Sequence, residues 1–153
     1  MKAKKLVLAV ASSFACASFG MANAEVPYPK EQFASFVVEK LDVNSLPSAY
    51  RPKSEKGKKT FSDYGYTVRK LGEKEAVVEA ARGGELSIRI LQPGDNGIYA
   101  CVAEPSADGG NPQAQSVILL KRKNSSELLK GRESAREFES CPVVEGIETN
   151  TTY

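Results

Sequence analysis

Apolar and polar residues follow two different periods along this chain. Near its start, Phe33, Phe36, Val37 and Leu41 are spaced three and four residues apart, which places them on one side of a helix. Farther along, short segments alternate apolar and polar residues, as expected for strands with one buried face. The pattern therefore predicts a helix over about residues 29–41, with a sheet after it.

Five strands are predicted between residues 64 and 120. The clearest one has Leu86, Ile88 and Ile90 on one face, and the Gly83-Gly84 pair before it is typical of a tight hairpin turn. The five segments are 64–69, 76–80, 86–90, 98–103 and 117–120. The last of them is apolar on both faces, which predicts a central strand. Because short connections favour antiparallel neighbours, we expect a meander sheet.

A second, shorter helix is predicted after the last strand. Asn124 can cap it, Glu127 completes a pattern similar to a capping box, and apolar residues from Leu128 to Phe138 recur at helical spacing, although Gly131 weakens the middle. The expected fold class is therefore α+β: an antiparallel meander of about five strands, an N-terminal helix on one face and a short C-terminal helix. This layout is similar to cystatin-like helix-on-sheet folds, a likeness of architecture that carries no functional residues.

The first 24 residues have the pattern of a secretory signal peptide. Lys2, Lys4 and Lys5 precede an apolar run, and Ala22-Asn23-Ala24 fits a signal-peptidase cleavage site. The apolar run is too short and too interrupted for a helix that spans a membrane. We therefore expect a cleaved leader, no transmembrane segment after its removal, and a bacterial periplasmic or secreted location.

Removal of the leader changes the composition. The chain has 21 basic and 19 acidic residues, and three of the lysines belong to the leader, so the remainder carries a formal charge of −1 instead of +2. A nearly neutral protein gives no reason to expect nucleic acid as a partner. The remaining length predicts a single α+β domain over residues 25–145, followed by a flexible tail at 146–153.

The cysteine count changes in the same way. Cys16 leaves with the leader, and Cys101 and Cys141 remain as an even pair. In an oxidising compartment such a pair predicts a structural disulfide. We expect this bond to tie the segment after the second helix to the fourth predicted strand.

The chain has no histidine, which excludes Ser-His-Asp and Cys-His catalysis and every metal site built on histidine. No Ser-x-x-Lys or Gly-x-Ser-x-Gly motif occurs. We therefore expect no enzyme activity, no cofactor and no metal centre. A hydrolase that uses paired carboxylates is the remaining enzymatic alternative. Its candidates are Glu73, Glu75, Glu79, Glu85 and Glu104.

Two loops, 51–59 and 104–112, and three tyrosines supply a candidate binding surface. Residues 51–59, here named the basic loop, contain five cations and one acid, Glu55; such a loop can bind an anionic surface or can be a solvated connection. The tyrosines can form an aromatic patch or pack in the core. The candidate residues are Arg51, Lys53, Lys56, Lys58, Lys59, Tyr64, Tyr66, Tyr99, Asp108 and Asn111.

Together these features favour a monomeric, non-enzymatic binding module, similar to an inhibitor or an adaptor, whose partner is a protein or a cell-envelope component. Two alternatives stay open. A small-ligand carrier requires an apolar cavity of roughly a few hundred Å³ between helix and sheet. A carboxylate-dependent hydrolase requires a pocket that holds at least two acids with perturbed pKa values.

Overall fold

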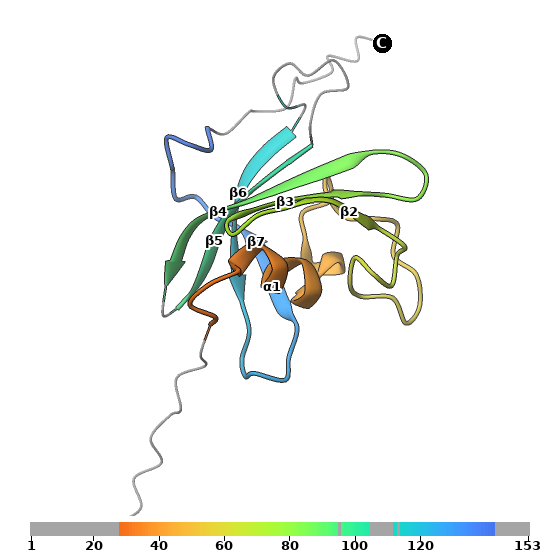
Figure 1. Ribbon diagram of the computed structural model, residues 1–153, viewed down its shortest axis with the longest axis horizontal. Helices are drawn as coiled ribbons and strands as arrows, with labels where there is room; N and C mark the ends of the chain where they lie inside the picture. Colours follow the sequence, from red (N-terminus) through yellow and green to blue (C-terminus); the bar gives the residue numbers. More distant parts are fainter. Residues whose placement is uncertain (1–27, 95, 105–111, 113, 143–153) are drawn as a thin grey trace, which may run out of the picture.

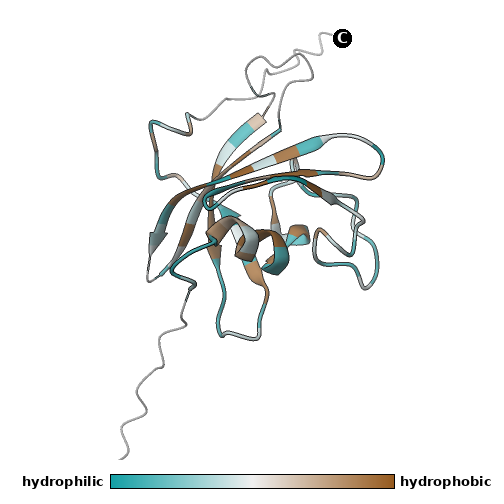
Figure 2. Ribbon diagram, viewed as in Figure 1, coloured by the Kyte–Doolittle hydropathy of each residue, from teal (hydrophilic) through white to brown (hydrophobic). Residues whose placement is uncertain are grey.

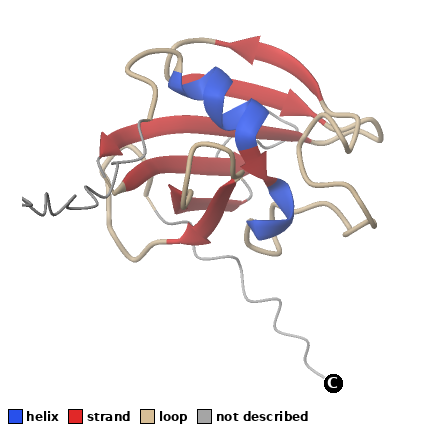
Figure 3. Cartoon of the chain, turned by 90° about the horizontal axis from the view of Figure 1, so that it is seen from below, coloured by secondary structure: helices blue, strands red, loops and turns tan. Residues whose placement is uncertain are grey.

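One curved sheet dominates the structure, a computed structural model that describes residues 28–94, 96–104, 112 and 114–142. The sheet curls around a single α-helix as a half-barrel (Figure 1; Figure 3). In chain order the elements are α1 (Phe33–Lys40), β1 (Leu41–Asp42), the 3-10 helix η1 (Val43–Ser45), β2 (Thr67–Leu71), β3 (Glu75–Glu79), β4 (Glu85–Gly94), β5 (Gly97–Glu104), β6 (Ala114–Lys121) and β7 (Leu129–Glu133).

The sheet has seven strands in the order β1-β7-β6-β5-β4-β3-β2. Neighbours from β7 to β2 are antiparallel, whereas β1 pairs with β7 in parallel, Leu41 opposite Leu129. The five predicted strands are present as β2 to β6. The predicted fold class is nevertheless wrong, because β1 and β7 make the sheet seven-stranded and mixed. The predicted likeness to cystatin-like folds, which depended on a five-stranded antiparallel meander, is wrong for the same reason.

The predicted C-terminal helix is also wrong, because its segment forms a turn and then β7. The capping contacts do form: the Asn124 side chain accepts hydrogen bonds from the N–H groups of Ser126 and Glu127. Buried and exposed residues then alternate as in a strand: Leu129 and Gly131 are buried, and Lys130 between them is exposed. Pairing with β6 buries Leu129 and thereby overrides the local helix signal.

The N-terminal helix is present but shorter than predicted. It begins at Phe33 because Gln32 adopts a left-handed conformation, with φ 54°, which a right-handed helix cannot contain. It ends where Leu41 becomes extended and enters β1. Phe33, Ala34, Val37 and Val38 are the buried residues of α1, and the helix packs against β3 and β4.

The main core fills the space between α1 and the concave face of the sheet. Its largest fully buried side chains include Phe61, Leu46, Ile88, Ile98 and Ile118. Apolar residues concentrate along the strands and the helix, and hydrophilic residues in the loops (Figure 2). Leu86, Ile88 and Ile90 of β4 are buried while Arg89 between them is exposed, so the predicted one-sided strand is confirmed.

A smaller apolar cluster lies on the other face of the sheet. Cys101 and Val117, opposite one another in β5 and β6, pack there with Cys141. The residues 117–120 of β6 are therefore buried on both faces, as predicted. Residues 134–142, here named the tethered segment, cover this outer cluster.

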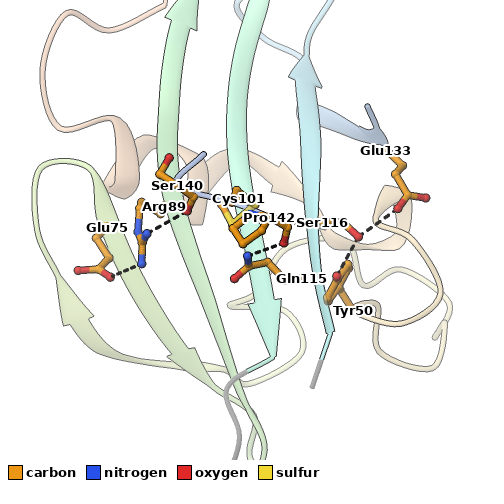
Figure 4. Close-up of a disulfide and its surroundings, with 10 residues drawn as sticks. Tyr50, Glu75, Arg89, Cys101, Gln115, Ser116, Glu133, Ser140 and Pro142 are labelled. Atoms are coloured by element: carbon orange, nitrogen blue, oxygen red, sulfur yellow. Dashed lines mark hydrogen bonds and ion pairs between the residues drawn. A yellow bond between two sulfur atoms is a disulfide. The ribbon is translucent and has the colours of Figure 1, made fainter. Parts of the chain in front are cut away.

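The predicted disulfide between Cys101 and Cys141 is confirmed, with the two Cα atoms 5.7 Å apart. Two side chains of the sheet support it: Arg89 donates to the carbonyl of Ser140 at 3.2 Å, and Gln115 donates to the carbonyl of Pro142 at 2.8 Å (Figure 4). The tethered segment is thus fixed to β4, β5 and β6, although it follows a strand and not the predicted helix.

Part of what the sequence predicts lies outside the described residues: the leader at 1–24, the tail at 146–153, and the loop that contains Asp108 and Asn111. Within the described ranges, no helix is long and apolar enough to cross a bilayer.

Candidate binding surface

The basic loop is held in place by Tyr64. The Tyr64 hydroxyl accepts a hydrogen bond from the backbone N–H of Glu55 at 3.0 Å and donates one to Oδ1 of Asn44 at 2.8 Å. Asn44 in turn donates from Nδ2 to the carbonyl of Lys58 at 2.7 Å. One tyrosine and one asparagine therefore tie two points of the loop to η1.

Asp63 fixes the end of the same loop. Its carboxylate accepts hydrogen bonds from the N–H groups of Thr60 and Lys59, at 2.8 and 2.9 Å, while the Thr60 hydroxyl accepts one from the Asp63 N–H at 3.3 Å. The backbone hydrogen bonds from Thr60 and Lys59 lower the pKa of Asp63, because they stabilise the charged form.

Most cations of the basic loop point into solvent. Lys58 pairs with Glu55 at 2.8 Å and lies over the Tyr64 ring, 5.5 Å from its centroid. The other four, Arg51, Lys53, Lys56 and Lys59, are exposed. Within the described part of the chain none of these four makes an ion pair.

Arg82, in the turn between β3 and β4, extends this cationic surface. Gly83 and Gly84 of this turn line a groove together with Arg51 of the basic loop. The pKa of Glu55 is lowered mainly by its contact with Lys58 and also by the charges of Arg82 and Lys53. The candidate surface therefore carries six cations, Arg51, Lys53, Lys56, Lys58, Lys59 and Arg82, and two acids, Glu55 and Asp63.

A small groove of about 160 Å³ lies between the start of the basic loop and the β3–β4 turn. Tyr50 and Tyr66 line it together with Gly83, Gly84 and two acids; the full lining is Ala49, Tyr50, Arg51, Tyr66, Ala80, Gly83, Gly84, Glu85, Leu86 and Glu104. Gly83 and Gly84, with φ of 84° and 95°, form the predicted hairpin turn. Tyr66 contacts Phe61 edge to face, with ring centroids 5.2 Å apart.

Tyr50 begins a chain of hydroxyl and carboxylate groups beside this groove. Its hydroxyl donates to Oγ of Ser116, and Ser116 donates to Glu133, each at 3.0 Å (Figure 4). The pKa values of Tyr50 and Tyr66 are both raised, mainly because burial disfavours the charged phenolate. Both phenols are therefore neutral hydrogen-bonding groups at neutral pH.

The three predicted tyrosines do not form one patch. Tyr64 and Tyr66 pack at the border of the main core, next to the basic loop. Tyr99 lies in the outer cluster, where the guanidinium of Arg136 stacks on its ring at 4.9 Å and on the ring of Phe138 at 5.0 Å. Tyr99 is thus part of the packing of the tethered segment and is separate from the basic surface.

The candidate acids for hydrolysis are spread over the sheet. Glu75 pairs with Lys70 at 2.7 Å, and Glu79 pairs with Arg69 at 3.2 Å. The contact with Lys70 lowers the pKa of Glu75, whereas a general acid needs a raised pKa. Only Glu85 and Glu104 of the candidate acids line the groove at Tyr50.

Several residues that build the surface were not predicted. Tyr50 and Asn44 give no distinctive signal, because their partners are 66 and 14 residues away in sequence. Thr60 and Asp63 do give one: Thr-x-x-Asp is the spacing of a capping box. That pattern could have located the end of the basic loop.

Within the described ranges no group of three or more cysteine, aspartate or glutamate side chains is arranged to hold a metal ion. No protein-family model, no curated protein and no solved structure matches this chain. A functional conclusion therefore depends on the chemistry of the chain's own residues.

Proposed function

We propose that this protein is a non-enzymatic binding module of the bacterial periplasm or exterior, and that the basic loop with Arg82 docks on an acidic surface of a protein or cell-envelope component. The observation that carries the proposal is the bracing of the loop: Tyr64, Asn44 and Asp63 fix its backbone, while four of its cations face solvent.

Preorganisation is what makes such a loop suited to binding. A flexible loop loses conformational entropy when it is ordered against a partner, and a loop already held by its own hydrogen bonds avoids much of that cost. The exposed cations then steer an acidic partner and set its orientation, an effect that weakens with added salt.

The two alternatives have less support. Buried side chains such as Phe33, Val37 and Ile88 fill the space between α1 and the sheet, where a carrier needs a cavity. The groove at Tyr50 lies at the surface beside the β3–β4 turn, and no residue of α1 lines it. A hydrolase needs one acid with a raised pKa, and Glu75 has a lowered one.

The experiment compares two triple variants with the same change of charge. The loop variant carries Lys53→Gln, Lys56→Gln and Lys59→Gln, which leaves Lys58, Tyr64 and Asp63 in place. The control variant carries Lys30→Gln, Lys121→Gln and Lys123→Gln, at exposed positions outside the loop. Each purified protein is immobilised and used to recover components of an envelope extract at low salt.

We expect wild type and the control variant to recover the same component, released by salt, and the loop variant to recover about tenfold less of it, roughly 1.4 kcal/mol of binding free energy. Equal melting temperatures of the three proteins show that the loop variant is folded. Equal recovery by the loop variant, or no recovery by wild type, contradicts the proposal.

A further inference from the structure

The strand β2 leaves one edge of the sheet open. It pairs with β3 on one side, and it ends the strand order; within the described residues no strand pairs with its other side. All five residues of β2 are exposed. The opposite edge is different, because β1 has two residues and both are buried.

The open edge carries apolar side chains on the core face of the sheet. Val68 lies opposite Val78, and Leu71 lies opposite Ala76; both partners in β3 are completely buried. Val68 and Leu71 are nevertheless 49% and 52% exposed, because α1 packs against β3 and β4 and leaves β2 beyond its edge.

A bulge makes this arrangement possible. Residues three apart in a regular strand point to opposite faces, but the register shifts between Val68 and Lys70. Arg69 is the extra residue, and the shift brings Leu71 back to the face of Val68. The apolar face of the core thus continues onto β2, where nothing in the described structure covers it.

The other face of the same edge carries two exposed cations. Arg69 and Lys70 pair with Glu79 and Glu75 of β3, yet their side chains stay 61% and 63% exposed. The basic loop lies on the same side of the molecule as β2 (Figure 1). A segment added here meets apolar side chains on one face and cations on the other.

We propose that β2 binds an extended segment of a partner protein as an eighth strand, and that this segment alternates apolar and acidic residues. Main-chain hydrogen bonds to an open edge supply affinity in this mode, and alternate side chains supply specificity. The apolar residues cover Val68 and Leu71, and the acidic residues lie beside Arg69 and Lys70. This proposal rests on the proposed function and names the form of its partner.

Charge decides against a second copy of the chain as the occupant. In the centred register of two antiparallel copies of β2, Arg69 of one copy would face Arg69 of the other, and like charges on facing strands are unfavourable. An acidic strand has the complementary charge.

The test uses the full mature chain and short synthetic peptides. The first peptide alternates valine and glutamate; a second has the same sequence with alternate amides N-methylated, and a third replaces glutamate by lysine. Binding is measured by fluorescence anisotropy, and protection of the Thr67–Leu71 amides is measured by hydrogen exchange.

We expect the valine-glutamate peptide to bind and to slow exchange of the β2 amides, the N-methylated peptide to bind at least about tenfold more weakly, and the lysine peptide not to bind. Equal binding of the N-methylated peptide, or unchanged exchange in β2, overturns the proposal. So does a dimer of the protein alone with protected β2 amides. If Arg69 and Lys70 serve only to prevent aggregation at this edge, the valine-glutamate peptide will not bind, and that result also overturns the proposal.

A pair of variants separates this proposal from the proposed function. Val68→Ser combined with Leu71→Ser removes the apolar strip, while the lysine variant of the basic loop removes three of the loop's five cations. If the loop variant loses the envelope partner and the β2 variant keeps it, the strand proposal is wrong and the proposed function stands. If the loop variant keeps the partner, the proposed function is wrong.

Discussion

Gly97 lies directly against the backbone of Leu120: a Cβ atom at Gly97 would be 2.7 Å from the carbonyl oxygen of Leu120. Gly97 also has φ 139°, which side-chain-bearing residues rarely adopt. It is the first residue of β5, so the antiparallel pairing of β5 with β6 depends on this close approach.

Gly97→Ala should lower the free energy of unfolding by about 2 kcal/mol or more, since it combines backbone strain with a clash against a neighbouring strand. Urea denaturation measures the change. Gly72→Ala is the matched control, because its Cβ would lie 3.5 Å from the Glu75 carbonyl oxygen, an ordinary contact, and should change stability by less than about 0.5 kcal/mol. Equal effects of the two substitutions would contradict the prediction.

Tyr64→Phe should loosen the basic loop without unfolding the protein. The substitution removes the hydroxyl that contacts Glu55 and Asn44 and should cost about 1 kcal/mol. Hydrogen exchange at the Glu55 amide should accelerate. Tyr99→Phe is the control, because the Tyr99 hydroxyl makes no hydrogen bond within the described structure; a similar acceleration in this control would show that the loop is not held by Tyr64.

Replacement of both Cys101 and Cys141 by alanine should lower the free energy of unfolding by about 3–4 kcal/mol in the chain-entropy estimate, since the bond closes a loop of 40 residues. Calorimetry should show a lower Tm for this variant. The fully reduced wild-type protein should melt at nearly the same temperature as the variant. An unchanged Tm would mean that the bond contributes nothing to stability.

Asp63→Asn should make the free energy of unfolding decrease less steeply as the pH falls. The pKa of Asp63 is lower in the folded protein than in the unfolded chain, where an aspartate has a pKa of about 4. Its contribution is therefore fully present above that pH and is lost as the pH falls through the folded-state pKa. Urea midpoints measured between about pH 5 and pH 3 should fall less steeply for the variant, and parallel curves would be the contrary result.

The sequence predicted the strands whose own residues alternate, β4 above all, because Leu86, Ile88 and Ile90 need no distant partner to reveal their face. It also predicted the cysteine bond, because Cys101 and Cys141 are an even pair once Cys16 is assigned to the predicted leader. It did not predict β1 or β7. Leu41 has the pattern of a helix end, and the contacts of Asn124 are equally those of a helix cap. The strand β1 forms through its pairing with β7, and β7 through its pairing with β6 and β1.

The charges of the candidate surface were predictable from the sequence, whereas the hydrogen bonds that fix its loop were not. Lys53, Lys56 and Lys59 are visible in the sequence as a basic run, and Tyr64 as an aromatic residue near it. The hydrogen bond that makes Tyr64 part of the loop joins it to Asn44, 20 residues earlier. Such a contact depends on the closed fold, which no local pattern contains.

The parallel pairing of β1 with β7 joins two segments that are far apart in the sequence, which bears on the order in which the sheet can form. Leu41 pairs with Leu129, and Asp42 pairs with Lys130, 88 residues later in the chain. Closing so long a loop costs entropy before any contact repays it. The antiparallel hairpins can therefore form before β1 and β7 pair, and a chain truncated before residue 129 should leave β6 with an open edge and the outer cluster of Cys101 and Val117 without its cover.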